Sequence, residues 1–265
     1  VGFIRSGEKL LLIDAPFRVE DQLSWCREIN QLGHFREKYL LLLDTHTDRT
    51  YGAHAAEANI LAHQNAVEIL ENRSGTIRQQ DLDFGIDMVL KEIPTNIHWP
   101  IPDLSYSHDL LINWEEAQIT ITHQPGAHLA GSWVHCDAKQ ILFVGDSVVV
   151  NQPPFFAWSD LETWLEEIRW LSSDRFKNYT IINGRNGIIK TKSIEKQHDL
   201  LLRAETLIQE VMQSESSPEI IKEAAEALLK KINYNREFKD LYLDRLTWGI
   251  KHYIQRHDLN LEAGH

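Results

Sequence analysis

The chain has 265 residues, of which 43% are hydrophobic, and its 27 basic and 39 acidic residues give a formal net charge of -12. This length allows one large domain or two small ones with a sizeable core. The negative charge repels phosphate backbones, and no run of Lys or Arg offsets it, so nucleic acid is not an expected partner. No segment has the uncharged apolar length of a membrane span, and no membrane partner is expected. The two cysteines, Cys26 and Cys136, suggest neither a disulfide framework nor a zinc ribbon, which fits a cytoplasmic protein.

The N-terminal half mixes strands with helices. The pattern predicts a hairpin from residues 1–5 and 9–14, a helix over 19–32 ended by Gly33, strands over 40–43 and 58–63, and a helix over 66–71. Residues 72–102, with scattered polar residues and three prolines, predict a long irregular segment, and loops of that length tend to be functional.

The C-terminal half continues with strands and ends in helices only. We expect strands over 109–114, 117–123, 132–136, 140–145 and 179–184, and helices over 159–171, 194–212, 218–232 and 237–255. Ser217 precedes Pro218 and is placed to cap its helix. Hairpins combined with strand–helix units predict an α/β protein with helices outside its sheets.

Polar residues collect where predicted strands end. Such positions carry ligands in α/β folds, because the sheet holds them rigidly while the loops present side chains. They are Asp44, His46, Asp48 and Arg49 after "LLLL", His128 in "PGAHLAGS", Asp146 in "LFVGDS" and Arg185 in "NGRNG". We interpret these segments as parts of one site.

The order of these motifs resembles the order found in the metallo-β-lactamase superfamily of metal-dependent hydrolases. An opening hairpin ending in "LLID", a helix, an apolar strand that runs into an HxHxDH-like signature, and the "PGAHLAGS" and "LFVGD" turns follow the family order. The resemblance implies a four-layer αββα sandwich with the metal ions at its edge. We therefore expect a metallo-β-lactamase-like domain over residues 1–190 and a helical C-terminal extension over 191–265 packed on that domain.

The family signature is altered in this sequence. Aligned without gaps, it falls on Asp44, His46, Asp48 and Arg49, so its first histidine is replaced by Asp44 and its last by Arg49. The following "DRTYG" matches the family's "DHTGG" and favours this alignment. A rival alignment with two residues deleted makes His46 the first histidine.

The later motifs complete the comparison. By resemblance, His128 corresponds to the third ligand histidine and Asp146 to the bridging aspartate, whereas Arg185 replaces the final histidine. The first metal position would then be formed by Asp44, His46 and His128, with Asp146 within reach. Two imidazoles with one or two carboxylates suit zinc, iron or manganese.

The second metal position is expected to be lost. Its counterparts would be Asp48, Arg49, Asp146 and Arg185, and a guanidinium group has five donors and no lone pair with which to bind a cation. Two arginines in place of two neutral histidines add the charge of one divalent ion. We expect ion pairs such as those of Arg49 or Arg185 with Asp48 or Asp146.

These features predict a hydrolase-like protein with at most one metal ion. An ester, thioester or phosphoester would be the small-molecule substrate, with Asp48 or Asp146 handling the water and Arg49 and Arg185 stabilising negative charge. The alternative is a catalytically silent pseudoenzyme or binding module that binds no metal. Asp44 and Asp48 could also merely cap a short helix, and the arginines could be structural. A homodimer formed through the C-terminal helices is a further expectation.

Overall fold

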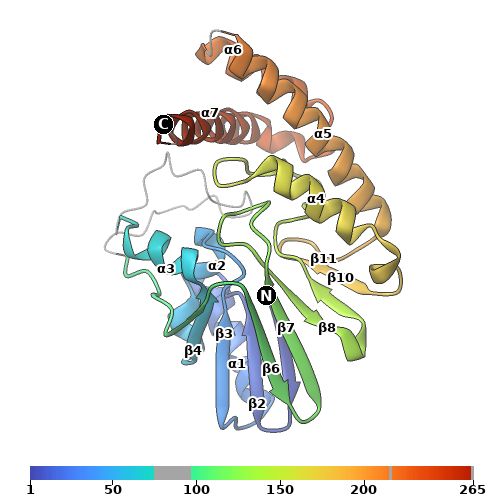
Figure 1. Cartoon of the computed structure of the whole chain (residues 1–265). Coiled ribbons are helices and arrows are strands. Elements are labelled where there is room, and N and C mark those ends of the chain that lie inside the picture. The colour runs from blue at the N-terminus through green and yellow to red at the C-terminus, as the bar shows by residue number, and fades with distance from the viewer. Residues whose placement is uncertain (75–96, 215–216, 264–265) are drawn as a thin grey trace. The chain divides into compact units, whose positions relative to one another are not determined.

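The computed structural model describes residues 1–74, 97–214 and 217–263 and combines helices with two sheets (Figure 1). This chain divides into two compact units, one made of Val1–His123 with Ala130–Leu142 and the other of Gln124–Leu129 with Phe143–His265. The α/β class predicted from the sequence is confirmed. The division predicted at residue 190 stays a prediction.

The first unit holds a five-stranded sheet with the order β1-β2-β3-β4-β5. Its elements are β1 (Gly2–Ser6), β2 (Lys9–Ile13), α1 (Val19–Gln31), β3 (Glu37–Leu41), α2 (Thr47–Thr50), β4 (Asn59–His63), α3 (Gln64–Glu71) and β5 (Leu104–Tyr106). Strands β1 and β2 form the predicted antiparallel hairpin, whereas β2, β3, β4 and β5 run parallel. The carboxyl ends of β2, β3 and β4 therefore lie at one edge of this sheet.

Leucines are buried on both faces of this sheet. Leu10, Leu12, Leu40 and Leu42 pack in one cluster with Ile29 of α1, and the residues that alternate with them are buried as well. Burial on both faces is typical of parallel strands and accounts for the unbroken leucine runs.

The other sheet has six strands in the order β11-β10-β9-β8-β7-β6. They are β6 (Asp109–Trp114), β7 (Ala117–His123), β8 (Ser132–Cys136), β9 (Ile141–Phe143), β10 (Thr180–Asn183) and β11 (Gly187–Ile189). The pairs β6 with β7, β7 with β8, and β10 with β11 are antiparallel.

Helices dominate the second unit. They are α4 (Leu161–Leu171), α5 (Thr191–Gln213), α6 (Pro218–Leu229) and α7 (Lys239–Ala263), coloured from yellow to red in Figure 1. Asp160 caps α4 by accepting a hydrogen bond from the Thr163 N–H at 2.9 Å. Ser217 caps α6 through the Ile220 N–H at 3.3 Å, as the Ser-Pro pair predicted.

Several element boundaries differ from those predicted. Strand β3 begins at Glu37 and ends at Leu41 instead of running over 40–43, and the short strands β5 and β11 were not predicted. The short helix considered after Thr50 is α2, which ends at Thr50. Helix α7 extends to Ala263. Of the irregular segment predicted over 72–102, residues 75–96 lie outside the described residues.

Within the described ranges, no helix combines the length and the apolar character needed to cross a membrane.

Candidate functional site

A buried cluster of charged side chains lies at the carboxyl edge of the first unit's parallel sheet. Strands β2 and β3 pair in register, with Ile13 opposite Leu41, so the residues that follow them meet at one edge. Asp14 follows β2 directly, and Asp44, His46 and Arg49 follow β3. All four side chains are buried.

Arg49 binds two carboxylates in this cluster. Its Nη1 lies 3.0 Å from Asp44 Oδ2 and 3.6 Å from Asp14 Oδ2. Its backbone oxygen also accepts a hydrogen bond from the Ala15 N–H at 3.0 Å. The guanidinium group therefore links the ends of β2 and β3, an arrangement that the sequence did not predict.

Asp14 is a member of the cluster that sequence reasoning missed. Its Oδ1 accepts a hydrogen bond from the Leu43 N–H at 2.9 Å, and its backbone has a positive φ of 57°. Burial raises the pKa of Asp14 to about 6, while the neighbouring Arg49 lowers it and Asp44 raises it. The sequence signal for Asp14 is its position at the end of "LLID", which by itself indicates only the end of a hairpin.

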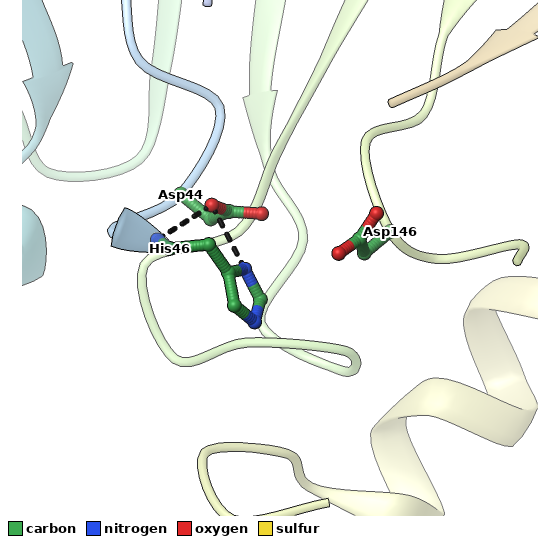
Figure 2. A group of neighbouring side chains, drawn as sticks. All are labelled: Asp44, His46 and Asp146. Carbon is green, nitrogen blue, oxygen red and sulfur yellow. Dashed lines mark hydrogen bonds and ion pairs between the residues drawn. The ribbon is translucent and has the colours of Figure 1, made fainter. Parts of the chain in front are cut away.

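Asp44 orients His46. Figure 2 shows both contacts: Asp44 Oδ1 accepts a hydrogen bond from the His46 N–H at 2.9 Å and lies 2.9 Å from His46 Nδ1. A carboxylate next to one ring nitrogen fixes the plane of an imidazole, as in metal sites in which a second group orients the ligand. His46 also precedes α2, where Asp48 is buried in the first turn.

Asp146 and Arg185 form the charged pair of the second unit. Arg185 Nε and Nη2 lie 2.8 and 2.7 Å from the same oxygen, Asp146 Oδ2. The turns that carry them are tied together, because the Gly184 N–H donates to the Gly145 oxygen at 2.8 Å and the Val144 N–H donates to the Ile182 oxygen at 2.9 Å. The ion pair expected between these two residues is therefore present, and both side chains are buried.

His128 lies in the loop Gln124–Leu129 of the second unit and is buried. Helix α4 and the segment before it hold this loop. The Gly126 N–H donates to Glu167 Oε1 at 2.8 Å, and the Gly126 oxygen accepts from the Asp160 N–H at 2.8 Å. The Leu129 N–H donates to the Trp158 oxygen at 3.0 Å.

Two features of this loop depend on close packing. A Cβ atom on Gly126 would lie 2.4 Å from Trp164 Cα, so the glycine is required for the approach of the loop to α4. Glu167 is buried, and burial raises its pKa to about 8 although the Gly126 N–H lowers it. Glu167 was missed because nothing in the sequence distinguishes it from the other acids of its helix.

The same helix supports the Asp146 turn. Trp164 Nε1 donates to the Ser147 oxygen at 2.8 Å, and Trp164 is fully buried. Helix α4 therefore fixes the loop of His128 and the turn of Asp146 within the second unit.

Asp44, His46 and Asp146 carry donor atoms of the kinds that could hold a metal ion. Two carboxylates and one imidazole suit zinc, iron or manganese. Asp44 and His46 belong to the first unit, and Asp146, also drawn in Figure 2, belongs to the second. His128 is not part of this group among the residues that the structure describes.

Comparisons with known proteins agree on the fold. No family model matches the sequence, and no curated protein matches it. Solved structures do match. A metallo-β-lactamase from Pontibacter korlensis is 16% identical with a TM-score of 0.56, over 76% of this chain and 85% of that one. TMB-1 is 14% identical with a TM-score of 0.55, over 77% and 84%. VMB-1 is 12% identical with a TM-score of 0.55, over 76% and 84%.

At these identities the matches establish the fold and not the activity. The predicted αββα sandwich with a helical C-terminal region is confirmed by them. The chain has the fold of the metallo-β-lactamase superfamily.

Proposed function

We propose that this protein is a hydrolase that works with at most one divalent metal ion and uses two arginines where its relatives would bind a second. The observation that carries the proposal is the pairing of each arginine with a buried site carboxylate. Arg49 lies 3.0 Å from Asp44, and Arg185 lies 2.7 Å from Asp146. Both arginines occupy sequence positions at which the resembling family has histidine.

The proposed ligands of the metal ion are Asp44, His46, His128 and Asp146. Their donor types fit zinc, iron or manganese, and Asp44, His46 and Asp146 support such a site. When bound, the ion would polarise a carbonyl or phosphoryl oxygen and lower the pKa of a water molecule. The proposal requires the two units to bring these residues together.

The protein's own residues supply the remaining chemistry. Asp146, held by two nitrogens of Arg185, or Asp48, at the start of α2, would orient the attacking water and take its proton. The positive charges of Arg49 and Arg185 would stabilise charge that develops on the substrate. An anionic ester, thioester or phosphoester is therefore the proposed substrate class.

One observation favours the silent alternative. Asp44 Oδ2 pairs with Arg49 Nη1, and Asp44 Oδ1 contacts the backbone N–H and the Nδ1 atom of His46. This network can hold the first unit's half of the site together without a metal ion, as a structural ion-pair cluster does. A binding module that kept the fold and lost its ions would be built in this way.

Metal content separates the two functions. We would purify the full chain without chelator or affinity-tag metal and count zinc, iron and manganese by mass spectrometry. The hydrolase proposal predicts about one equivalent, lost in a His46→Ala and His128→Ala double variant. The matched control is His54→Ala, which removes an exposed histidine of the first unit.

The opposite result supports the silent module. It would be the absence of metal in the wild-type protein together with an unchanged unfolding temperature on addition of zinc, manganese or iron. Sedimentation of the same preparation tests the proposed homodimer, for which α5, α6 and α7 are the proposed interface.

A further inference from the structure

The second unit contains a cavity whose lining does not include the charged pair of Asp146 and Arg185. Its volume is about 480 Å³, within the range of small-molecule sites. Three segments line it: residues 149–152, one face of α5 and residues 231–233 after α6. None of the residues assigned to catalysis or metal binding lines this cavity.

The cavity carries a surplus of positive charge. Its charged lining residues are Lys196, Arg203 and Lys231 against Asp199, three cations and one acid, a surplus of two. Lys196, Asp199 and Arg203 recur at the spacing of one face of α5. Because the whole chain has a formal charge of -12, this local surplus is unlike the rest of the molecule.

Gln197 adds a buried hydrogen-bond donor to the lining. Its side chain is only 3% exposed, and its Oε1 accepts a hydrogen bond from the Val149 N–H at 3.4 Å. Its Nε2 has no hydrogen-bond partner in the described part of the chain. An amide donor buried without an acceptor is costly, and such a group in a native protein calls for an explanation, of which a bound ligand is one.

Apolar side chains complete the cavity. Val149, Val150, Leu200 and Ile232 line it and are partly buried. Cations and a buried donor beside an apolar wall match a ligand that has an anionic group joined to an apolar body. Inorganic phosphate would contact only the cations and the buried donor, and would leave the apolar wall without a partner.

We propose that this cavity binds a small organic anion, one in which a carboxylate or phosphate group is attached to an apolar portion. The inference does not depend on the proposed hydrolase activity. The site nevertheless adjoins the charged pair through hydrogen bonds, because the Val150 N–H donates to Asn186 Oδ1 at 3.1 Å, and Asn186 follows Arg185. Ligand that orders residues 149–150 would therefore also stabilise the Arg185 turn.

Calorimetric titration of the full chain tests the inference. The probes are phenyl phosphate and benzoate, with inorganic phosphate and benzyl alcohol as probes that carry one half of the chemistry each. We expect phenyl phosphate or benzoate to bind with one-to-one stoichiometry, more tightly than either half-probe, and more weakly as salt is raised.

Variants place the binding in the cavity. Lys231→Gln and Lys196→Gln should each weaken binding about threefold to tenfold, because each removes one cation that faces the anion. The matched control is Lys230→Gln, which removes an exposed lysine beside Lys231 that does not line the cavity. Gln197→Met should weaken binding without an equal effect on the unfolding temperature.

Three outcomes overturn the inference. One is that neither organic anion binds at millimolar concentration. Another is that both bind equally well to the Lys231→Gln and Lys230→Gln proteins. The third is that inorganic phosphate or benzyl alcohol binds as tightly as phenyl phosphate, since the combination of charge and apolar surface would then contribute nothing. Lys196→Gln, Lys230→Gln and Lys231→Gln change exposed side chains, so misfolding does not confuse their results.

Discussion

Replacing Glu167 by Gln tests whether a neutral carboxyl group holds the loop that carries His128. Glu167 is buried in α4, and its Oε1 accepts the Gly126 N–H at 2.8 Å. Glutamine keeps an acceptor oxygen for this hydrogen bond and removes the ionisable group. The variant should therefore change how stability depends on pH and leave the geometry of the loop in place.

The direction and size of the effect come from the pKa of Glu167. Burial raises this pKa from 4.5 to about 8, so the folded protein keeps a proton that the unfolded chain releases. The stabilisation is fully present below pH 4.5 and is lost as the pH rises through about 8. At about 1.4 kcal/mol for each pH unit, the loss over this range is at most about 5 kcal/mol. A typical domain has only about 5 to 15 kcal/mol of stability, so the effect is measurable.

The assay is denaturant unfolding of the wild-type and Glu167→Gln proteins at several pH values between 4.5 and 8.5. We expect the free energy of unfolding of the variant to exceed that of the wild type by a margin that grows with pH. Glu166→Gln is the matched control, because it removes an exposed acid from the next position of the same helix. A difference that stays flat across this range would refute the assignment of Glu167 as a neutral buried acid.

Three further predictions follow from the same contacts. Gly126→Ala places a Cβ 2.4 Å from Trp164 Cα and should cost about 2 to 4 kcal/mol; an unchanged melting temperature would contradict this. Arg49→Gln leaves buried carboxylates without their cation and should cost about 3 to 5 kcal/mol in urea unfolding, with partial rescue by Asp44→Asn. Replacing Arg49 and Arg185 together by His should raise the metal count by about one equivalent, and an unchanged count would refute the idea that these arginines block a second ion.

The fold could be predicted well wherever local chemistry agrees with packing. The Ser217-Pro218 pair marked the start of α6, and the two apolar segments on either side of Ser6-Gly7-Glu8 marked the first hairpin. Strand β3 was misplaced because its start is set by pairing: Lys9 of β2 lies opposite Glu37, and the two side chains form a 2.9 Å ion pair. A polar pair of this kind extends a strand beyond its apolar run, and only the partner strand shows it.

The site could be predicted in part. Order and residue type indicated Asp44, His46, Asp146 and Arg185, and the structure gives each of them a buried charged neighbour. Glu167 could not be found because Glu162 and Glu166 share its helix and its residue type. Glu167 is buried and bound by the Gly126 N–H of a loop distant in sequence, and no sequence period carries that information.

The pairing of Arg49 with Asp44 also sets the condition for metal binding. A metal ion that binds Asp44 has to compete with a guanidinium group 3.0 Å from Asp44 Oδ2 in a buried cluster. Two positive groups on one carboxylate repel each other, and burial strengthens that repulsion because little water screens it. Metal affinity at this position therefore includes the cost of moving Arg49 or of tolerating its charge. The hydrolase and the silent module differ in whether the other ligands make up for this cost, and His46 and Asp146 are the donors on which that balance depends.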